Sequence, residues 1–157
     1  MKDSAEVLYL ENQLCFPLYA ASRLTTKLYA PYLKELDITY PQYLVMMVLW
    51  QQDDQSVNDI GEKLLLETNT LTPLLKRLEQ KNILERNRST QDERSVVISL
   101  TNKGKKLKEK ALKIPHEIAN SLMSDDLDFE RLAEFQETLN LLVNVLSGRD
   151  ESKEVCS

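Results

Sequence analysis

Residues 56–101 constrain the fold more than any other part of the chain. Val57, Ile60 and Leu64 recur at helical spacing and predict a short helix. After a turn around residues 65–67, the stretch "TNT" opens a second helix. Its apolar stripe follows the i, i+3, i+4, i+7 pattern and consists of Leu71, Leu74, Leu75 and Leu78. Two short helices joined by a tight turn predict a helix-turn-helix unit.

A β-hairpin is predicted directly after this unit. Ile83–Arg88 is short and basic, whereas Ser95–Leu100 is β-branched and apolar. Between them, Ser89–Arg94 contains no apolar residue. A helix-turn-helix followed by a charged hairpin is the winged-helix arrangement. Its second helix suits the DNA major groove, and its hairpin carries arginine toward the backbone or the minor groove.

A long helix is predicted upstream of this unit. It begins near residues 12–14 and runs toward Ala30, where Pro31 ends or kinks it. Pro17 is tolerated because backbone N–H groups in the first helical turn have no helical partner. This places Cys15 at or near a helix N-terminus.

A second upstream helix follows. Thr39 and Gln42 are spaced as a capping box, and the apolar helix that they open continues through Trp50. Within it, Met46 and Met47 are expected to fill the core.

Two helices are predicted downstream. Thr101 caps one that runs toward Ile114 and is broken at Pro115. An amphipathic helix covers about residues 127–146. The acidic cluster of Asp125, Asp126 and Asp128 is expected to be its N-cap region rather than a metal site. Terminal helices whose apolar stripes cannot be buried within one chain predict a homodimer. A two-fold dimer also matches a DNA site with two half-sites.

The distribution of charge is consistent with binding to phosphate. The chain of 157 residues carries a net charge of −5. Residues 125–157 hold nine acidic and three basic residues, a local −6, so residues 1–124 carry +1. Within the latter, residues 73–88 carry +3. A basic stretch opposed by an acidic C-terminal arm is typical of a protein that presents one face to nucleic acid, although such a run is also common on solvated helices.

The cysteine content and the lack of long apolar runs predict a cytoplasmic protein with reduced thiols, neither secreted nor membrane-spanning. Cys15 and Cys156 are too far apart in sequence to suggest a disulfide framework. Together with the lone His116, which is expected at the surface, they are too widely spaced for a zinc site, and no cofactor is expected.

Cys15 has one property of a reactive thiol by its position, and it would have a second if tyrosines approach it. A position at a helix N-terminus lowers a thiol pKa, and hydrogen-bond donors would lower it further. The neighbouring Leu14, Phe16 and Leu18 are expected to form an apolar pocket, which suits an organic hydroperoxide better than hydrogen peroxide. Oxidation would give a sulfenic acid, which a second thiol can trap. From the residues alone, an inert buried cysteine remains an alternative.

Four stretches resemble a known family: "LENQLCFPLYAASR", "DITYPQYLVMMVLW", "TLTPLLKRLEQ" and "DERSVVISLT". The chain resembles the MarR family of winged-helix repressors, and within it the OhrR-type sensors of organic hydroperoxides, up to about Leu146. The "DER" turn is typical of the broad family. The segment around Cys15, together with "TYPQYL", is typical of the peroxide-sensing subgroup.

The resemblance implies a thiol site that spans two subunits. Cys15 would be the redox switch. Tyr29 and Tyr40 would reach it from the other subunit and donate hydrogen bonds to its thiolate, and Tyr19 would lie beside it.

The resemblance also implies a DNA-binding surface. Thr68–Arg77 would be the recognition helix, and Asn69 stands where the family pattern has a small glycine. In the wing, Asp92 would brace the hairpin while Arg94 enters the minor groove. The residues expected to contact DNA are Thr68, Asn69, Thr70, Thr72, Lys76, Arg77, Arg86, Arg88 and Arg94.

The predicted fold is mainly α with a small β-hairpin wing, a winged helix-turn-helix flanked by N- and C-terminal dimerisation helices. Residues 1–148 are expected to form a single domain and residues 149–157 a polar tail. Within the domain, dimerisation helices would occupy about 1–36 and 102–147, and the DNA-binding part about 37–101.

The predicted function is a homodimeric, non-enzymatic repressor that binds double-stranded operator DNA. It would release this DNA when an organic hydroperoxide oxidises Cys15, which a low-molecular-weight thiol then caps, so that Cys156 is dispensable. Two alternatives remain: a MarR-type repressor released by a small aromatic or drug-like ligand, and a thiol peroxidase. The absence of a CxxC pair in the sequence and the presence of a DNA-reading module argue against the peroxidase.

Overall fold

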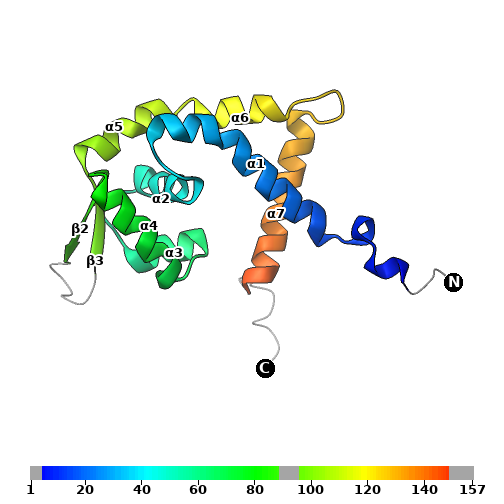
Figure 1. The fold of residues 1–157 in the computed structure, drawn as a ribbon, viewed down its shortest axis with the longest axis horizontal. Helices are drawn as coiled ribbons and strands as arrows, with labels where there is room; N and C mark the ends of the chain where they lie inside the picture. The colour runs from blue at the N-terminus through cyan, green and yellow to red at the C-terminus, as the bar shows by residue number, and fades with distance from the viewer. Residues whose placement is uncertain (1–4, 89–95, 149–157) are drawn as a thin grey trace.

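Helices α3 (Val57–Leu64) and α4 (Thr68–Gln80) form the predicted helix-turn-helix. Figure 1 shows them beside the β2–β3 hairpin in the computed structural model, which describes residues 5–88 and 96–148. The winged-helix fold predicted from the sequence is confirmed.

The turn between α3 and α4 is tight because of two residues. Leu65 has a left-handed backbone with φ 54°. Gly61 allows close approach of the turn, since a Cβ atom there would lie 2.8 Å from the Leu66 carbonyl oxygen. A side chain at residue 61 would therefore push α3 away from the start of α4.

The sheet has three antiparallel strands in the order β1-β3-β2. The two predicted strands are present as β2 (Leu84–Arg88) and β3 (Val96–Leu100). Strand β1 (Gln55–Ser56) was not predicted, because two residues are too few to show a periodic pattern. The predicted turn over residues 89–94, with Asp92 and Arg94, lies outside the described residues.

Helix α1 (Cys15–Leu36) begins just after the predicted start near residues 12–14 and has Cys15 at its N-terminus, as expected. Two 3-10 turns precede it, at Glu6–Leu8 and Leu10–Asn12. The prediction that Pro31 ends or kinks the helix near Ala30 was wrong about its end, since α1 continues to Leu36. Pro31 cannot donate a hydrogen bond to the carbonyl one turn earlier. Burial of apolar side chains beyond the proline, including Leu36 at 4% exposure, holds the last turn in place.

Helix α2 (Tyr40–Gln51) begins with the predicted capping box. The backbone N–H of Thr39 donates to Oε1 of Gln42 at 2.9 Å. Met46 is fully buried as expected, but the prediction for Met47 was wrong: its side chain is 44% exposed. Met47 lies on the face of α2 that turns away from the core.

The segment after the wing forms three helices instead of the predicted two. Thr101 caps α5 (Asn102–Ala111) by accepting a hydrogen bond from the Gly104 N–H at 3.1 Å. The break comes before Pro115, which lies in the first turn of α6 (Ile114–Leu122), where proline is well tolerated. The last helix, α7 (Phe129–Ser147), is capped by Asp128 as the acidic segment predicted.

The core lies where α2, the helix-turn-helix, the sheet and α5–α6 meet. Its largest fully buried apolar side chains are Met46, Leu49, Ile60, Leu71, Leu75, Leu78, Ile83, Leu84, Ile98 and Ile114. Thus the stripe of α4 that the sequence singled out supplies Leu71, Leu75 and Leu78 to the core, with Leu74 half-buried at its edge.

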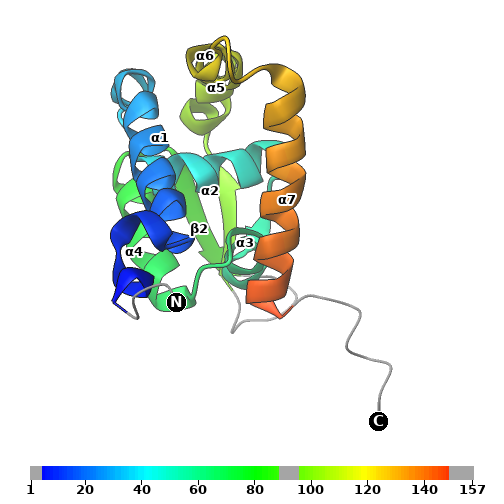
Figure 2. The same cartoon turned by 90° about the vertical axis from the view of Figure 1, so that its right-hand side faces the viewer.

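Helices α1 and α7 carry apolar side chains that nothing covers within the described part of the chain. Figure 2 separates these two helices, which overlap in Figure 1. None of the residues of α7 is buried among the described residues. Its exposed apolar side chains are Phe129, Phe135, Leu141, Val143, Val145 and Leu146. Among the residues with described structure, no helix is long and apolar enough to cross a membrane.

Candidate nucleic-acid interface and cysteine site

One face of α4 is free to contact a ligand because the opposite face is fully buried. Lys76 and Arg77 are exposed, two turns into the helix. At the N-terminal end, Thr68, Asn69 and Thr70 are also exposed. This end also carries the positive end of the helix dipole, which favours phosphate.

Thr72 fits the predicted role less well. It is half-buried, and its hydroxyl donates to the Thr68 carbonyl oxygen at 2.7 Å. The hydroxyl proton is therefore already engaged, and the oxygen can only accept. Thr70 differs, because it is exposed and its hydroxyl makes a longer contact of 3.3 Å with Oδ1 of Asn69.

The described part of the wing supplies two arginines on β2. Arg88 is exposed at the end of the strand, as expected for a DNA-contacting residue. Arg86 is half-buried, and its Nε atom is buried without a hydrogen-bond partner among the described residues.

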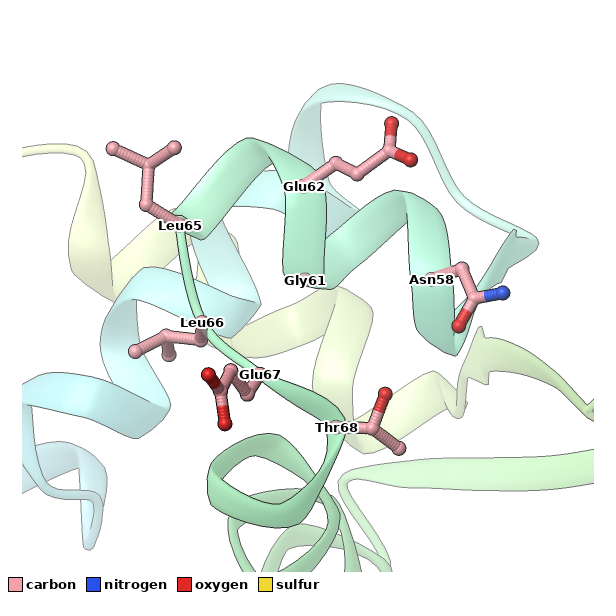
Figure 3. A pocket seen from close by; sticks show the side chains of 7 residues that line it. All are labelled: Asn58, Gly61, Glu62, Leu65, Leu66, Glu67 and Thr68. Atoms are coloured by element: carbon pink, nitrogen blue, oxygen red, sulfur yellow. The ribbon is translucent and has the colours of Figure 1, made fainter. Parts of the chain in front are cut away.

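A hollow of about 370 Å³ lies between α3 and α4, next to Thr68 (Figure 3). Figure 3 shows the carboxylates of Glu62 and Glu67 at this hollow. Their charge disfavours a phosphate group there. The surface suited to a polyanion therefore begins at Thr68 and extends along α4, not back into the turn.

Cys15 is the first residue of α1, and its thiol is free and exposed. The apolar pocket that its neighbours were expected to form is not closed within one chain, since Leu14 is 75% and Phe16 41% exposed. Tyr19 follows one turn later, 65% exposed, with the Arg23 guanidinium 5.9 Å from its ring centroid.

Tyr29, Tyr40 and Tyr43 form a cluster between α1 and α2, which we call the tyrosine cluster. The ring centroids of Tyr29 and Tyr40 are 4.9 Å apart in an edge-to-face arrangement. Tyr43 lies 5.9 Å from the first and 6.4 Å from the second. The structure thus brings together the two tyrosines that the sequence implied.

Burial, with neighbouring tyrosines, raises the pKa of Tyr29 to about 12, and burial also raises the pKa of Tyr43. The hydroxyl of Tyr29 therefore remains protonated at neutral pH. It is a hydrogen-bond donor suited to an anionic sulfur or oxygen atom.

Cys15 and the tyrosine cluster of the same chain cannot meet. Cys15 and Tyr29 lie on one continuous helix, and a rise of 1.5 Å per residue separates them by about 21 Å along its axis. Only a second chain could therefore bring a Cys15 thiol to these tyrosines.

Tyr43 extends the tyrosine cluster to an apolar cavity, which we call the α2–α5 hollow. This cavity of about 280 Å³ lies between α2 and the α5–α6 junction. Its lining includes Tyr43, Met47, Trp50, Lys108, Ala111, Leu112 and Pro115. The Trp50 ring centroid is 6.1 Å from that of Tyr43. Sequence reasoning missed Tyr43 and Trp50; their positions three and ten residues after Tyr40, near one helical face, were the available signal.

Residues 27–111 match the family model described as transcriptional regulator SarA/Rot. The chain is 49% identical over 132 residues to the organic hydroperoxide resistance transcriptional regulator of Bacillus subtilis strain 168. That alignment covers 84% of this chain and 90% of the relative.

Two solved structures share the fold. Reduced AbfR of Staphylococcus epidermidis, bound to DNA, matches with a TM-score of 0.74 and 38% identity, over 96% of this chain and 100% of AbfR. AbfR is also known in an overoxidised, DNA-bound form and in a disulfide form. The MepR–DNA complex of S. aureus matches with a TM-score of 0.76 and 28% identity, over 85% of this chain and 98% of MepR.

Proposed function

This chain belongs to the MarR/SarA-type family of winged-helix transcriptional regulators, and from that premise we propose that it is a homodimeric repressor controlled by oxidation of Cys15. It is a DNA-binding regulator and not an enzyme. The proposed signal is an organic hydroperoxide, and the proposed response is release of a double-stranded operator.

One observation carries the proposal. An exposed thiol stands at the start of α1, about 21 Å along the helix from a half-buried pair of tyrosines suited to stabilise it. The apolar faces of α1 and α7 are exposed as well. A two-fold dimer that buries these faces would place the Cys15 of one chain against Tyr29 and Tyr40 of the other.

The tyrosines would then activate the thiol. Hydroxyl groups that donate hydrogen bonds to a thiolate stabilise it and lower the thiol pKa. The helix N-terminus at Cys15 acts in the same direction. Tyr19, on the same chain as Cys15, is proposed to border the site.

The proposed reaction is stoichiometric. The Cys15 thiolate sulfur attacks the terminal oxygen of the hydroperoxide, an S–O bond forms, and the O–O bond breaks. The leaving alkoxide takes up a proton and departs as an alcohol, which leaves Cys15 as a sulfenic acid. A low-molecular-weight thiol then condenses with the sulfenic acid, releases water and leaves a mixed disulfide.

The α2–α5 hollow supports an organic signal over hydrogen peroxide. Tyr43 packs next to Tyr29 and Tyr40 and also lines the hollow. A hydroperoxide whose oxygen atoms lie against Tyr29 and Tyr40 could therefore extend its carbon group past Tyr43 into the hollow. The lining is mainly aromatic and aliphatic, so burial of an alkyl or aryl group there is favourable. Hydrogen peroxide has no such group.

The DNA-binding surface is proposed to combine the recognition helix with the wing. On α4 it consists of Thr68, Asn69, Thr70, Thr72, Lys76 and Arg77, and on the wing of Arg86, Arg88 and Arg94, with Asp92 as the bracing residue. The exposure of Lys76, Arg77 and Arg88 supports this assignment, whereas Asp92 and Arg94 lie outside the described residues. The half-buried Arg86 is the weakest member of the set.

The relatives support the same function. The Bacillus subtilis relative is an organic hydroperoxide resistance regulator, and AbfR is known in reduced, overoxidised and disulfide forms. A reducing cytoplasm, in which small thiols can both cap and regenerate Cys15, is the proposed location. Cys156 lies outside the described residues and is proposed to be dispensable.

A gel shift on the DNA upstream of the chain's own gene tests the proposal. Wild type and Cys15→Ser are expected to bind alike when reduced. Cumene hydroperoxide should release the wild type, hydrogen peroxide at the same concentration should release it far less, and neither should release Cys15→Ser. Release of Cys15→Ser by cumene hydroperoxide would show that Cys15 is not the sensor. Release by a small aromatic ligand alone would favour the ligand-controlled alternative.

A further inference from the structure

Asp53, just after α2, contacts both β3 and α5 through its carboxylate. Oδ1 of Asp53 accepts a hydrogen bond from the backbone N–H of Leu100, at the end of β3, at 2.8 Å. Its Oδ2 lies 3.3 Å from Nζ of Lys105, in the first turns of α5. Asp53 therefore joins the end of α2 to both the wing and the helix that leaves it.

The Asp53 carboxylate continues the hydrogen bonding along the edge of β3 beyond the end of β1. Strand β1 pairs only Gln55 and Ser56 with β3, opposite Ile98 and Val97. The carboxylate of Asp53 takes the place of a backbone carbonyl for the next N–H along that edge of β3. A charged acceptor makes this hydrogen bond stronger than a backbone contact.

Asp54 makes a second contact with the same strand. Its Oδ1 accepts from the hydroxyl of Ser99 at 2.5 Å. Asp54 has a left-handed backbone with φ 58°, and its N–H donates to Oδ1 of Asp53 at 3.0 Å. Aspartate is one of the few residues other than glycine that adopt this conformation, and the contact with Ser99 joins the turn to β3.

Trp50 links the last turn of α2 to α5 through two hydrogen bonds, one in which it donates and one in which it accepts. Its indole Nε1 donates to the Gly104 carbonyl oxygen at 2.9 Å. Nζ of Lys108 donates to the Trp50 carbonyl oxygen at 2.8 Å. Further along, Gln55 is buried and accepts a hydrogen bond from Lys63 of α3 at 2.6 Å.

The other end of α2 lies in the tyrosine cluster. Helix α2 has 12 residues, which corresponds to a length of about 18 Å, and Tyr40 is its first residue. Within the cluster Tyr43 lies next to Tyr40, and it also lies next to Trp50, so aromatic contacts connect the two ends of the helix. A short helix buried in a close-packed core moves as a rigid body, because such interiors do not deform continuously.

From these contacts we propose that Trp50, Asp53 and Asp54 are positioning residues that couple α2 to the wing. A displacement of Tyr40 that follows a change at the thiol site is passed along α2 and changes the orientation of β3 relative to α5. The inference rests on the proposed function for the origin of the displacement. It adds the route by which the thiol site controls DNA binding.

The test compares variants that remove different numbers of these contacts. Asp53→Ala removes every contact of the carboxylate, with the Leu100 N–H, with Lys105 and with the Asp54 N–H. Asp53→Asn retains an oxygen for the Leu100 N–H and loses the ion pair with Lys105. Ser99→Ala removes only the Asp54 contact and is the mildest change. Asp37→Asn is the matched control, because Asp37 forms an ion pair of 3.0 Å with Lys81 that does not involve β3 or α5.

Two quantities are measured for each variant: the rate of Cys15 oxidation by cumene hydroperoxide, and the ratio of the operator Kd after oxidation to the Kd before it. In Asp53→Ala we expect this ratio to fall at least tenfold toward one, while the oxidation rate stays within twofold of wild type. Asp53→Asn and Ser99→Ala should lower the ratio by about threefold, and Asp37→Asn should leave it unchanged.

A purely structural role would give another pattern. If Asp53→Ala lowered both affinities by the same factor and kept the ratio, or if Asp53→Asn and Ser99→Ala both kept the wild-type ratio, the inference would be overturned while the proposed function stood. A wild-type protein that is oxidised but does not release DNA would overturn both. If Asp53→Ala does not fold, the two milder variants decide the outcome.

Discussion

Tyr29 shows how much of the proposed chemistry depends on the surroundings of a single side chain. The sequence identified Tyr29 and Tyr40 through resemblance, and the structure brings their rings together. The sequence did not identify Tyr43, whose role follows from its packing against Tyr29, Tyr40 and Trp50. Which aromatic rings meet depends on how α1 crosses α2, and helical periodicity within one segment does not determine a crossing between two.

The raised pKa of Tyr29 predicts a loss of stability at alkaline pH. An unfolded tyrosine loses its proton near pH 10.0, whereas folded Tyr29 keeps it until about pH 12. Its contribution to the free energy of unfolding is therefore complete below pH 10.0 and is lost as the pH rises toward about 12. Urea unfolding at pH 9 to 11.5 should show a smaller loss in Tyr29→Phe than in wild type. Tyr9→Phe, an exposed tyrosine outside the cluster, should behave as wild type.

At the scale of elements, the sequence predicted the DNA-reading unit better than the helices around it. The capping residues Thr39, Thr101 and Asp128 lie where they were predicted, because capping depends on neighbours three residues away. Helix α1 does not end at Pro31, because burial of the following turn outweighs the proline. The break predicted at Pro115 comes before that residue, which lies in the first turn of α6. Both outcomes depend on tertiary contacts.

The assignment of α4 as the recognition helix predicts a specific salt dependence. Arg77→Ala should weaken operator binding and lower the slope of log K against log salt by about one if the side chain neutralises one phosphate. Arg77 is exposed, so the fold should tolerate the change. Gln80→Ala, an exposed and uncharged position on the same helix, is the control. Equal slopes for Arg77→Ala and Gln80→Ala would place α4 outside the phosphate contacts.

At the scale of the whole molecule, the proposed sensing site needs a second copy of the chain. One chain leaves the apolar faces of α1 and α7 exposed and separates Cys15 from the tyrosine cluster. The sequence predicted a dimer from the stripes on the terminal helices, but a stripe does not specify its partner surface. A two-fold dimer would also present two copies of α4 to successive major grooves, about 34 Å apart in B-DNA.

The most direct test of the central claim, that the sensing site forms across two chains and controls operator release, uses a mixed dimer. One protomer carries Cys15→Ser and the other carries Tyr29→Phe with Tyr40→Phe, and the two are purified together by different tags. The only Cys15 left in this dimer faces the intact tyrosines of its partner.

The account predicts that this cysteine is oxidised by cumene hydroperoxide within twofold of the wild-type rate, and that its oxidation releases operator DNA. The homodimer with both tyrosines replaced should react at least about tenfold more slowly, because its thiolate lacks the donors. A mixed dimer that reacts as slowly as that homodimer, or that is oxidised at the wild-type rate yet stays on the DNA, would contradict the account.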